Sequence, residues 1–93
     1  MIRHIYLFRL KDKNRAREAA EKMLTLREHI PYMTHMEVGF DFRGNSNSYE
    51  LCELCEFASM EDFKRFTDDP YHAGIREYMN GLVDTGVKID YEI

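Results

Sequence analysis

The chain has 93 residues, of which 44% are hydrophobic and 32% are charged, and its formal net charge is −4. This length fits one domain, and the composition is that of a globular protein without the polar bias that marks disorder. The 13 basic side chains are spread along the chain, whereas nucleic acid or anionic lipid would need them concentrated on one face. We therefore expect a single domain over residues 1–93 that binds neither nucleic acid nor a membrane.

The N-terminal stretch MIRHIYLFRL is apolar, but it carries Arg3, His4 and Arg9 and lacks a small-residue cleavage site. These features argue against a signal peptide. No stretch approaches the ~20 consecutive apolar residues of a membrane-spanning helix. We expect a cytoplasmic protein.

Residues 2–10 predict a β-strand with apolar side chains on both faces. Alternation along a strand places two sets of side chains on opposite faces. The first set is Ile2, His4, Tyr6, Phe8 and Leu10, and the second is Arg3, Ile5, Leu7 and Arg9. A face next to solvent would be more polar, so we expect this strand to be buried on both sides.

The segment KDKNRAREAAEKMLTLREHI predicts an amphipathic helix, because apolar side chains recur at intervals of three and four residues. Asp12 or Asn14 can cap its start. Pro31 ends it near His29, because a residue that precedes proline disfavours the helical conformation.

Residues 35–42 and 49–57 predict the second and third strands. The polar sequence RGNSNS between them is typical of a turn, so the two strands should form an antiparallel hairpin. The third strand, like the first, carries apolar side chains on both faces.

Two helix starts follow the third strand. Ser59 opens a capping box for a short helix. Asp69 and Pro70 then start another helix, with the acid as cap and the proline in the first helical position. We expect this helix to end before Gly86 and a last strand to cover residues 87–93.

These elements follow the order β-α-β-β-α-β, which is the ferredoxin-like α+β arrangement. Two helices can cover only one face of a four-stranded sheet, yet the first and third strands look apolar on both faces. A second copy of the same sheet would cover the open face. We therefore predict a homodimer in which the sheets of two subunits pack against each other.

The motif CELC places Cys52 and Cys55 three residues apart. On a strand these positions face opposite sides of the sheet, whereas a redox pair occupies a helix start and a zinc site needs two further ligands. The chain has no other cysteine and no histidine pair at ligand spacing. We predict two reduced structural cysteines, no metal and no other cofactor.

Two of the four histidines are candidates for a functional site. His29 ends a helix and His35 begins a strand, and solvent exposure is the ordinary interpretation of both. His4 lies in an apolar strand, where a histidine needs a hydrogen-bond partner. His72 lies in the first turn of a helix, whose dipole favours a neutral imidazole that can accept a proton. A structural role for both is the alternative.

Four stretches also carry a family resemblance: MIRHIYLFRLKD, MEVGFDF, CEFASMEDFKRFTDDPYH and VKIDYE. In this order and spacing they resemble the stress-responsive α/β-barrel domain family, or Dabb, over essentially the whole chain. The most specific parts are the strand with His4 and the helix start with Pro70 and His72. The resemblance implies a ferredoxin-like fold that dimerises through its sheets into an α+β barrel.

Some plant members of this family resemble stress-induced proteins, and other members cyclise polyketides. The cyclases use a histidine at the position of His72, with a tyrosine six residues earlier and a histidine at the position of His4 in the same cavity. Here both histidines match, but Phe66 replaces the tyrosine and has no hydroxyl to polarise a substrate oxygen. The resemblance implies His72 and His4 as catalytic candidates, and a different chemistry would use His72 alone or together with Tyr71 or Tyr6.

Three functions follow as alternatives. The first is binding of a small apolar or aromatic molecule in a barrel cavity, with substrate-binding side chains from Tyr6, Phe8, Phe66 and Tyr71. The second is a cofactor-free enzyme, of polyketide cyclase, aldol or monooxygenase-like type, with His72 as general base and His4 orienting the substrate. The third is a structural, stress-related dimer without a ligand. Convergence of His4 and His72 in one enclosed pocket would favour a site.

Overall fold

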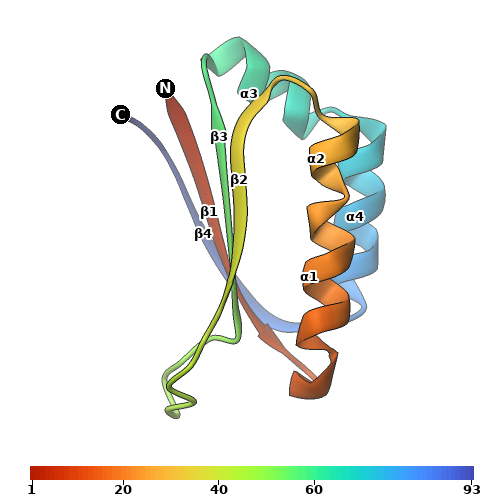
Figure 1. Ribbon diagram of the computed structural model, residues 1–93, viewed down its shortest axis with the longest axis vertical. Coiled ribbons are helices and arrows are strands. Elements are labelled where there is room, and N and C mark those ends of the chain that lie inside the picture. The colour runs from red at the N-terminus through yellow and green to blue at the C-terminus, as the bar shows by residue number, and fades with distance from the viewer.

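The computed structural model describes all residues, 1–93. Its elements are β1 (Ile2–Leu10), η1 (Lys13–Arg15), α1 (Ala16–Leu24), α2 (Leu26–His29), β2 (Met33–Phe40), β3 (Leu51–Phe57), α3 (Met60–Thr67), α4 (Pro70–Asn80) and β4 (Val83–Glu92). The strands form one antiparallel sheet in the order β2-β3-β1-β4, and the helices lie together on one side of it (Figure 1). The predicted ferredoxin-like order is confirmed.

Local sequence sets the start of α4 as predicted. The Asp69 carboxylate accepts hydrogen bonds from the N–H groups of Tyr71 at 2.8 Å and His72 at 3.4 Å. Pro70 occupies the first helical position, where its missing N–H is not needed. Ser59 caps α3 in the same way, through its hydroxyl oxygen.

The end of α4 differs from the prediction. The helix ends at Asn80, well before Gly86, because the chain turns at Gly81, whose N–H donates to the carbonyl of Tyr78 at 3.2 Å. β4 therefore starts at Val83, earlier than the predicted residue 87.

Gly86 lies inside β4, where it pairs with Phe8. A Cβ atom at Gly86 would lie 2.5 Å from Cε1 of Tyr6, so the tyrosine ring packs directly against the glycine backbone. Gly86 therefore serves a close side-chain approach, and its interpretation as a residue just past a helix end was wrong.

The hairpin strands are also shorter or displaced relative to the prediction. β2 covers Met33–Phe40 and β3 starts at Leu51. The connection between them includes a turn in which the Asp41 carboxylate accepts a hydrogen bond from the N–H of Gly44 at 2.6 Å. Gly44 has a φ of 65°, the left-handed conformation that favours glycine.

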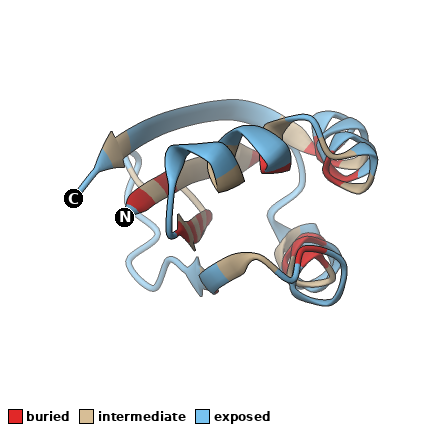
Figure 2. Ribbon diagram, turned by 90° about the horizontal axis from the view of Figure 1, so that it is seen from above, coloured by how far each residue is buried: buried red, intermediate tan, exposed pale blue.

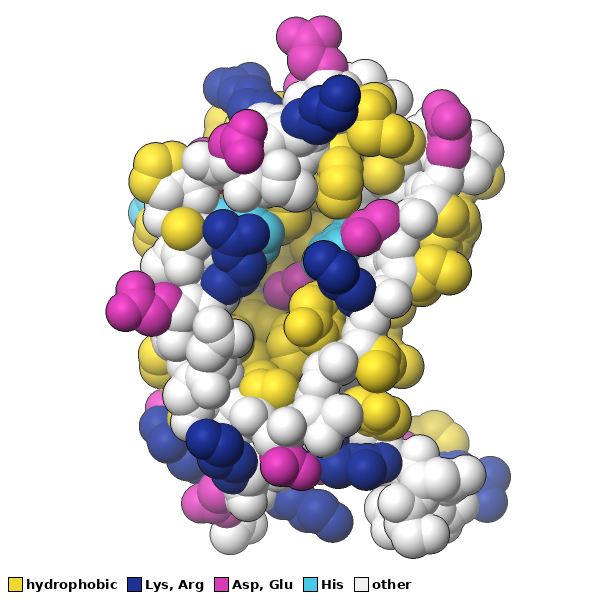
Figure 3. Space-filling view, turned by 180° about the vertical axis from the view of Figure 1, so that it is seen from behind, with side chains coloured by type: hydrophobic (Ala, Val, Ile, Leu, Met, Phe, Trp, Pro, Cys, Tyr) yellow, Lys and Arg dark blue, Asp and Glu magenta, His cyan; other side chains and the backbone are white.

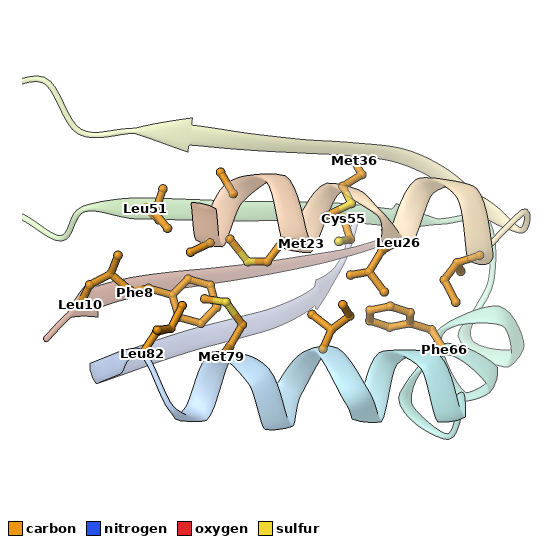
Figure 4. Packing of buried hydrophobic residues seen from close by; sticks show 14 of the residues in the cluster. Phe8, Leu10, Met23, Leu26, Met36, Leu51, Cys55, Phe66, Met79 and Leu82 are labelled. Atoms are coloured by element: carbon orange, nitrogen blue, oxygen red, sulfur yellow. The ribbon is translucent and has the colours of Figure 1, made fainter. Parts of the chain in front are cut away.

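The hydrophobic core lies between the helices and the sheet face that points toward them, which we call the inner face (Figure 4). In Figure 2 the buried residues of the helices and of β1 and β3 face this layer, whereas β4 is largely exposed. None of the helices is both long and apolar enough to span a membrane. The buried hydrophobic residues are Ile2, Phe8, Leu10, Ala19, Ala20, Met23, Leu26, Ile30, Met36, Leu51, Cys55, Phe57, Phe66, Ile75, Met79 and Leu82.

The opposite, outer face of the sheet has no helix over it (Figure 1). Strand register places a contiguous apolar patch there, at positions that pair across β3, β1 and β4. Val87 and Ile89 of this patch are 45% and 57% exposed. The outer-face patch consists of Ile5, Leu7, Cys52, Leu54, Val87 and Ile89.

Candidate functional site

A cavity of about 230 Å³ opens between the inner face of the sheet and the helices α3 and α4. Figure 3 shows it as a hollow with a hydrophobic floor, an acidic side chain inside, histidine at two places beside it and a basic side chain on either rim. The central strands β1 and β3 form its floor, while α4 and the edge strand β4 form its two walls. Its lining residues come from the helices and the inner face of the sheet, and the patch residues of the outer face are not among them.

Both histidines predicted as site residues line this cavity. His4 points to the inner face because it alternates in β1 with Tyr6 and Phe8. His72 reaches the cavity from the first turn of α4, which the Asp69 cap fixes at this end of the sheet. Both histidines are buried, with exposed fractions of 7% for His4 and 8% for His72.

The ring of His72 is fixed in one tautomer by the backbone. Its Nδ1 lies 3.1 Å from the carbonyl oxygen of Phe66, which can only accept, so Nδ1–H is the donor. Nε2 is left without a hydrogen-bond partner in the protein. Burial, and then the positive charge of Arg76, lower the pKa of His72 below its ordinary value, so the neutral form with a free Nε2 is favoured.

His4 has the opposite environment. Burial by itself lowers the pKa of His4, but the carboxylates of Glu53 and Asp90 outweigh it and raise the pKa above its ordinary value. Nδ1 hydrogen-bonds Asp90, and Nε2 lies 3.4 Å from Oε1 of Glu53. With an acid beside each ring nitrogen, the imidazolium form is favoured and neither nitrogen is free to accept a proton.

The aromatic residues predicted to bind substrate divide into two groups. Tyr6, Phe8 and Phe66 line the cavity. Tyr71 lies outside it: its ring stacks on His29 at 3.7 Å between centroids, and its hydroxyl is 2.5 Å from Oγ1 of Thr25. The geometry gives no support for Tyr71 as a contact to a molecule in the cavity.

A profile of the Stress responsive A/B Barrel Domain, Dabb, matches residues 2–93. The chain belongs to this family. Comparison of the Dabb chain with curated proteins found no match.

Solved structures similar to this Dabb domain show the same fold. A Dabb family protein from Mesorhizobium loti, described as ferredoxin-like, has 24% identity and a TM-score of 0.76, covering 99% of this chain and 95% of that one. A dimeric ferredoxin-like protein of unknown function from Bacteroides fragilis has 22% identity and a TM-score of 0.82, with the same 99% and 95% coverage. The hydroxynitrile lyase from Passiflora edulis has 19% identity and a TM-score of 0.86, covering 99% of this chain and 92% of the lyase.

Phe66, where the family resemblance implied a tyrosine in the cyclases, packs against His72. Its ring stacks on His72 with 3.8 Å between centroids and 19° between planes, and it is completely buried. It therefore packs the imidazole in place and supplies no proton donor.

Sequence reasoning missed the acids that flank His4. Glu53 shares the inner face of β3 with Leu51 and Cys55, and an acid on an otherwise apolar face is a signal that could have singled it out. Asp90 is brought to His4 by strand pairing between β1 and β4, which no local pattern reveals. The basic rim residues Arg76 and Lys88 were missed for the same reason.

Nothing in the chain gathers three or more histidine, cysteine or acidic side chains in an arrangement that could hold a metal ion. Cys52 and Cys55 are both free thiols and lie on opposite faces of β3. Burial raises the pKa of Cys55, which keeps it protonated and unreactive.

Proposed function

We propose that this Dabb protein is a homodimer that binds a small apolar or aromatic molecule in the cavity of each subunit. The observation that carries the proposal is the convergence of His4 and His72 in one cavity with aromatic walls. Small-molecule sites combine such walls with a few fixed polar groups, which orient the ligand. A purely structural core is filled by apolar side chains, and two buried imidazoles beside an open cavity do not contribute to such packing.

Two observations support the homodimer. The outer-face patch leaves aliphatic side chains in solvent in the isolated chain, above all Val87 and Ile89, at a cost of about 25 cal/mol per Å² of apolar surface. The neighbour from Bacteroides fragilis is described as dimeric. Because the cavity and the outer face lie on opposite sides of the sheet, dimerisation leaves the cavity open.

Binding can be tested with 2-methoxynaphthalene, an apolar aromatic probe, by ligand-observed NMR. We expect saturable binding to the wild type and its loss in Val83→Trp, because the indole would fill the cavity that Val83 lines. Ile93→Trp adds the same ring at an exposed site and should leave binding unchanged. No binding to the wild type, or equal binding by both variants, would favour the structural, ligand-free alternative.

Proton transfer is a second candidate function, supported by the protonation state of His72. A neutral imidazole with an unpartnered Nε2 in a cavity has the properties of a general base. A neighbour of the same fold is named as a hydroxynitrile lyase. His4 would act on the substrate through its positive charge, because both of its ring nitrogens already face carboxylates.

Deuterium uptake by 2-indanone in D₂O tests this base function, since the exchange requires removal of a proton from carbon. We expect exchange to be accelerated by the protein and to slow by about 100-fold or more in His72→Gln. His29→Gln, at an exposed histidine, is the matched control. Equal exchange rates for the wild type and His72→Gln would rule out His72 as the base while leaving ligand binding intact.

A further inference from the structure

Glu53 is an acid in a position where acids are rarely found. It lies on the inner face of β3, a central strand, and only 6% of its side chain is exposed. Its neighbours on that face of β3 are Leu51 and Cys55, both completely or nearly completely buried. What remains of its exposure is directed into the cavity, which it lines.

The Glu53 carboxylate is short of hydrogen-bond donors. Its contact with the protein's charged groups is an ion pair at 3.4 Å between Oε1 and Nε2 of His4, and no N–H or O–H group of the chain donates a well-aligned hydrogen bond to either oxygen. A carboxylate can accept about four hydrogen bonds, and burying it without them is costly. The second oxygen, Oε2, therefore has unused acceptor capacity.

The other polar groups of the cavity do not meet this need. Arg76 and Lys88 are exposed on the rim, and neither forms an ion pair with Glu53. Nε2 of His72 has no hydrogen on it and cannot donate. No lining side chain, Tyr6 and Asn80 included, donates a well-aligned hydrogen bond to Glu53, so an acceptor on Glu53 stays open to a donor from a ligand.

We propose that Glu53 is a ligand-binding residue that accepts a hydrogen bond from a hydroxyl group, so that the cavity selects phenols or alcohols over equally apolar molecules without a hydroxyl. The inference deepens the proposed binding function and rests on it. Floor and walls of aromatic side chains, including the stacked pair Tyr6 and Phe8 at 4.4 Å, suit the hydrocarbon part of such a molecule. The His4 imidazolium keeps Glu53 paired while its other oxygen serves the ligand.

Two probes of matched shape test this selection: 2-naphthol, and 2-methoxynaphthalene, in which the hydroxyl is methylated. Hydrogen bonds to a charged acceptor predict that the wild type binds 2-naphthol about tenfold more tightly, or better. In Glu53→Leu the preference should disappear while the ether still binds. Glu61→Leu makes the same change at an exposed acid of α3 and should keep the preference.

A general structural role for Glu53 would weaken both probes equally in Glu53→Leu, and that result would overturn the proposal. Glu53→Gln preserves the shape and leaves a neutral acceptor, so it should reduce the preference without abolishing it; this variant decides the matter if Glu53→Leu does not fold. Equal binding of both probes by the wild type would refute the selection by Glu53 but leave the binding function standing. Failure of both probes to bind would refute both proposals.

Discussion

His4 and His72 show how the surroundings of one residue type set its chemistry. Both are buried in one cavity, and burial alone would lower the pKa of each. Glu53 and Asp90 reverse that effect at His4, whereas at His72 the charge of Arg76 adds to it and the hydrogen bond to the Phe66 carbonyl, which raises the pKa, is too weak to reverse it. The cavity therefore favours the charged form at His4 and the neutral form at His72, a separation of pKa values that is often found at functional sites.

The first prediction concerns the titration of these histidines. By ¹⁵N NMR of the imidazoles, His4 should titrate above the ordinary value of about 6.5 and His72 below it. The signal with the lower pKa should be absent from the spectrum of His72→Gln, which assigns that signal to His72. Observation of the reverse order would contradict the described hydrogen bonding.

The same shifts predict how stability depends on pH. The contribution of His4 to the free energy of unfolding is fully present below about pH 6.5 and is lost as pH rises through the raised pKa of His4. The contribution of His72 is present above about pH 6.5 and is lost as pH falls through its lowered pKa. We expect urea unfolding from pH 5 to 9 to show that the wild type loses stability as the pH falls, and that His72→Gln loses less. The two proteins should not differ in their loss of stability at alkaline pH.

At the scale of elements, β4 and α4 each contain a glycine, but only the glycine in β4 is required by packing. Gly86 in β4 is covered by the Tyr6 ring, whereas Gly74 in α4 has no atom within 4 Å of the place where a Cβ would stand. The first glycine is required by packing across strands. The second occupies an exposed helical position at which any small residue would fit.

We expect Gly86→Ala and Gly74→Ala to have opposite effects on the free energy of unfolding. Gly86→Ala forces Tyr6 to move and should destabilise the protein by about 1–3 kcal/mol. Gly74→Ala should stabilise it by about 0.5–1 kcal/mol, because alanine favours the helical conformation. Urea denaturation of both variants measures the difference, and equal effects would show that the Tyr6 ring does not pack on Gly86.

At the scale of the whole molecule, the single layer of helices leaves the outer face of the sheet uncovered. β1 and β3 are the central strands, and both place aliphatic side chains on that face. A second sheet would cover them and would build the α+β barrel implied by the family resemblance.

The prediction at this scale is that Ile89→Asp prevents dimerisation. The change places a charge in the outer-face patch on both subunits, where it would have no partner, and should weaken dimerisation at least ~10-fold. Met60→Asp introduces the same charge on α3, on the helical side of the sheet, and should leave the dimer intact. Analytical ultracentrifugation distinguishes the two, and a monomeric wild type at micromolar concentration would refute the homodimer.

Local patterns were sufficient to predict the elements and one part of the site. Alternation in β1 predicted the common face of His4, Tyr6 and Phe8, and the Asp69–Pro70 start of α4 placed His72 in its first turn. The ends of helices and strands were less predictable, because a glycine such as Gly86 is equally compatible with a helix end and with a tightly packed position in a strand. Tyr71, next to His72 in sequence, points to Thr25 because adjacent residues of a helix face different directions.

The sequence by itself determined the order of the elements, the inner face of β1 and the helix start that carries His72, because alternation, capping and proline act between neighbouring residues. The tertiary structure decided the rest of the site. It brought Asp90 to His4 across 86 positions of sequence, and Glu53 to the other side of the same ring. The charge states of the two histidines depend on those distant groups, because electrostatic interactions depend on distance in space and not on distance along the chain.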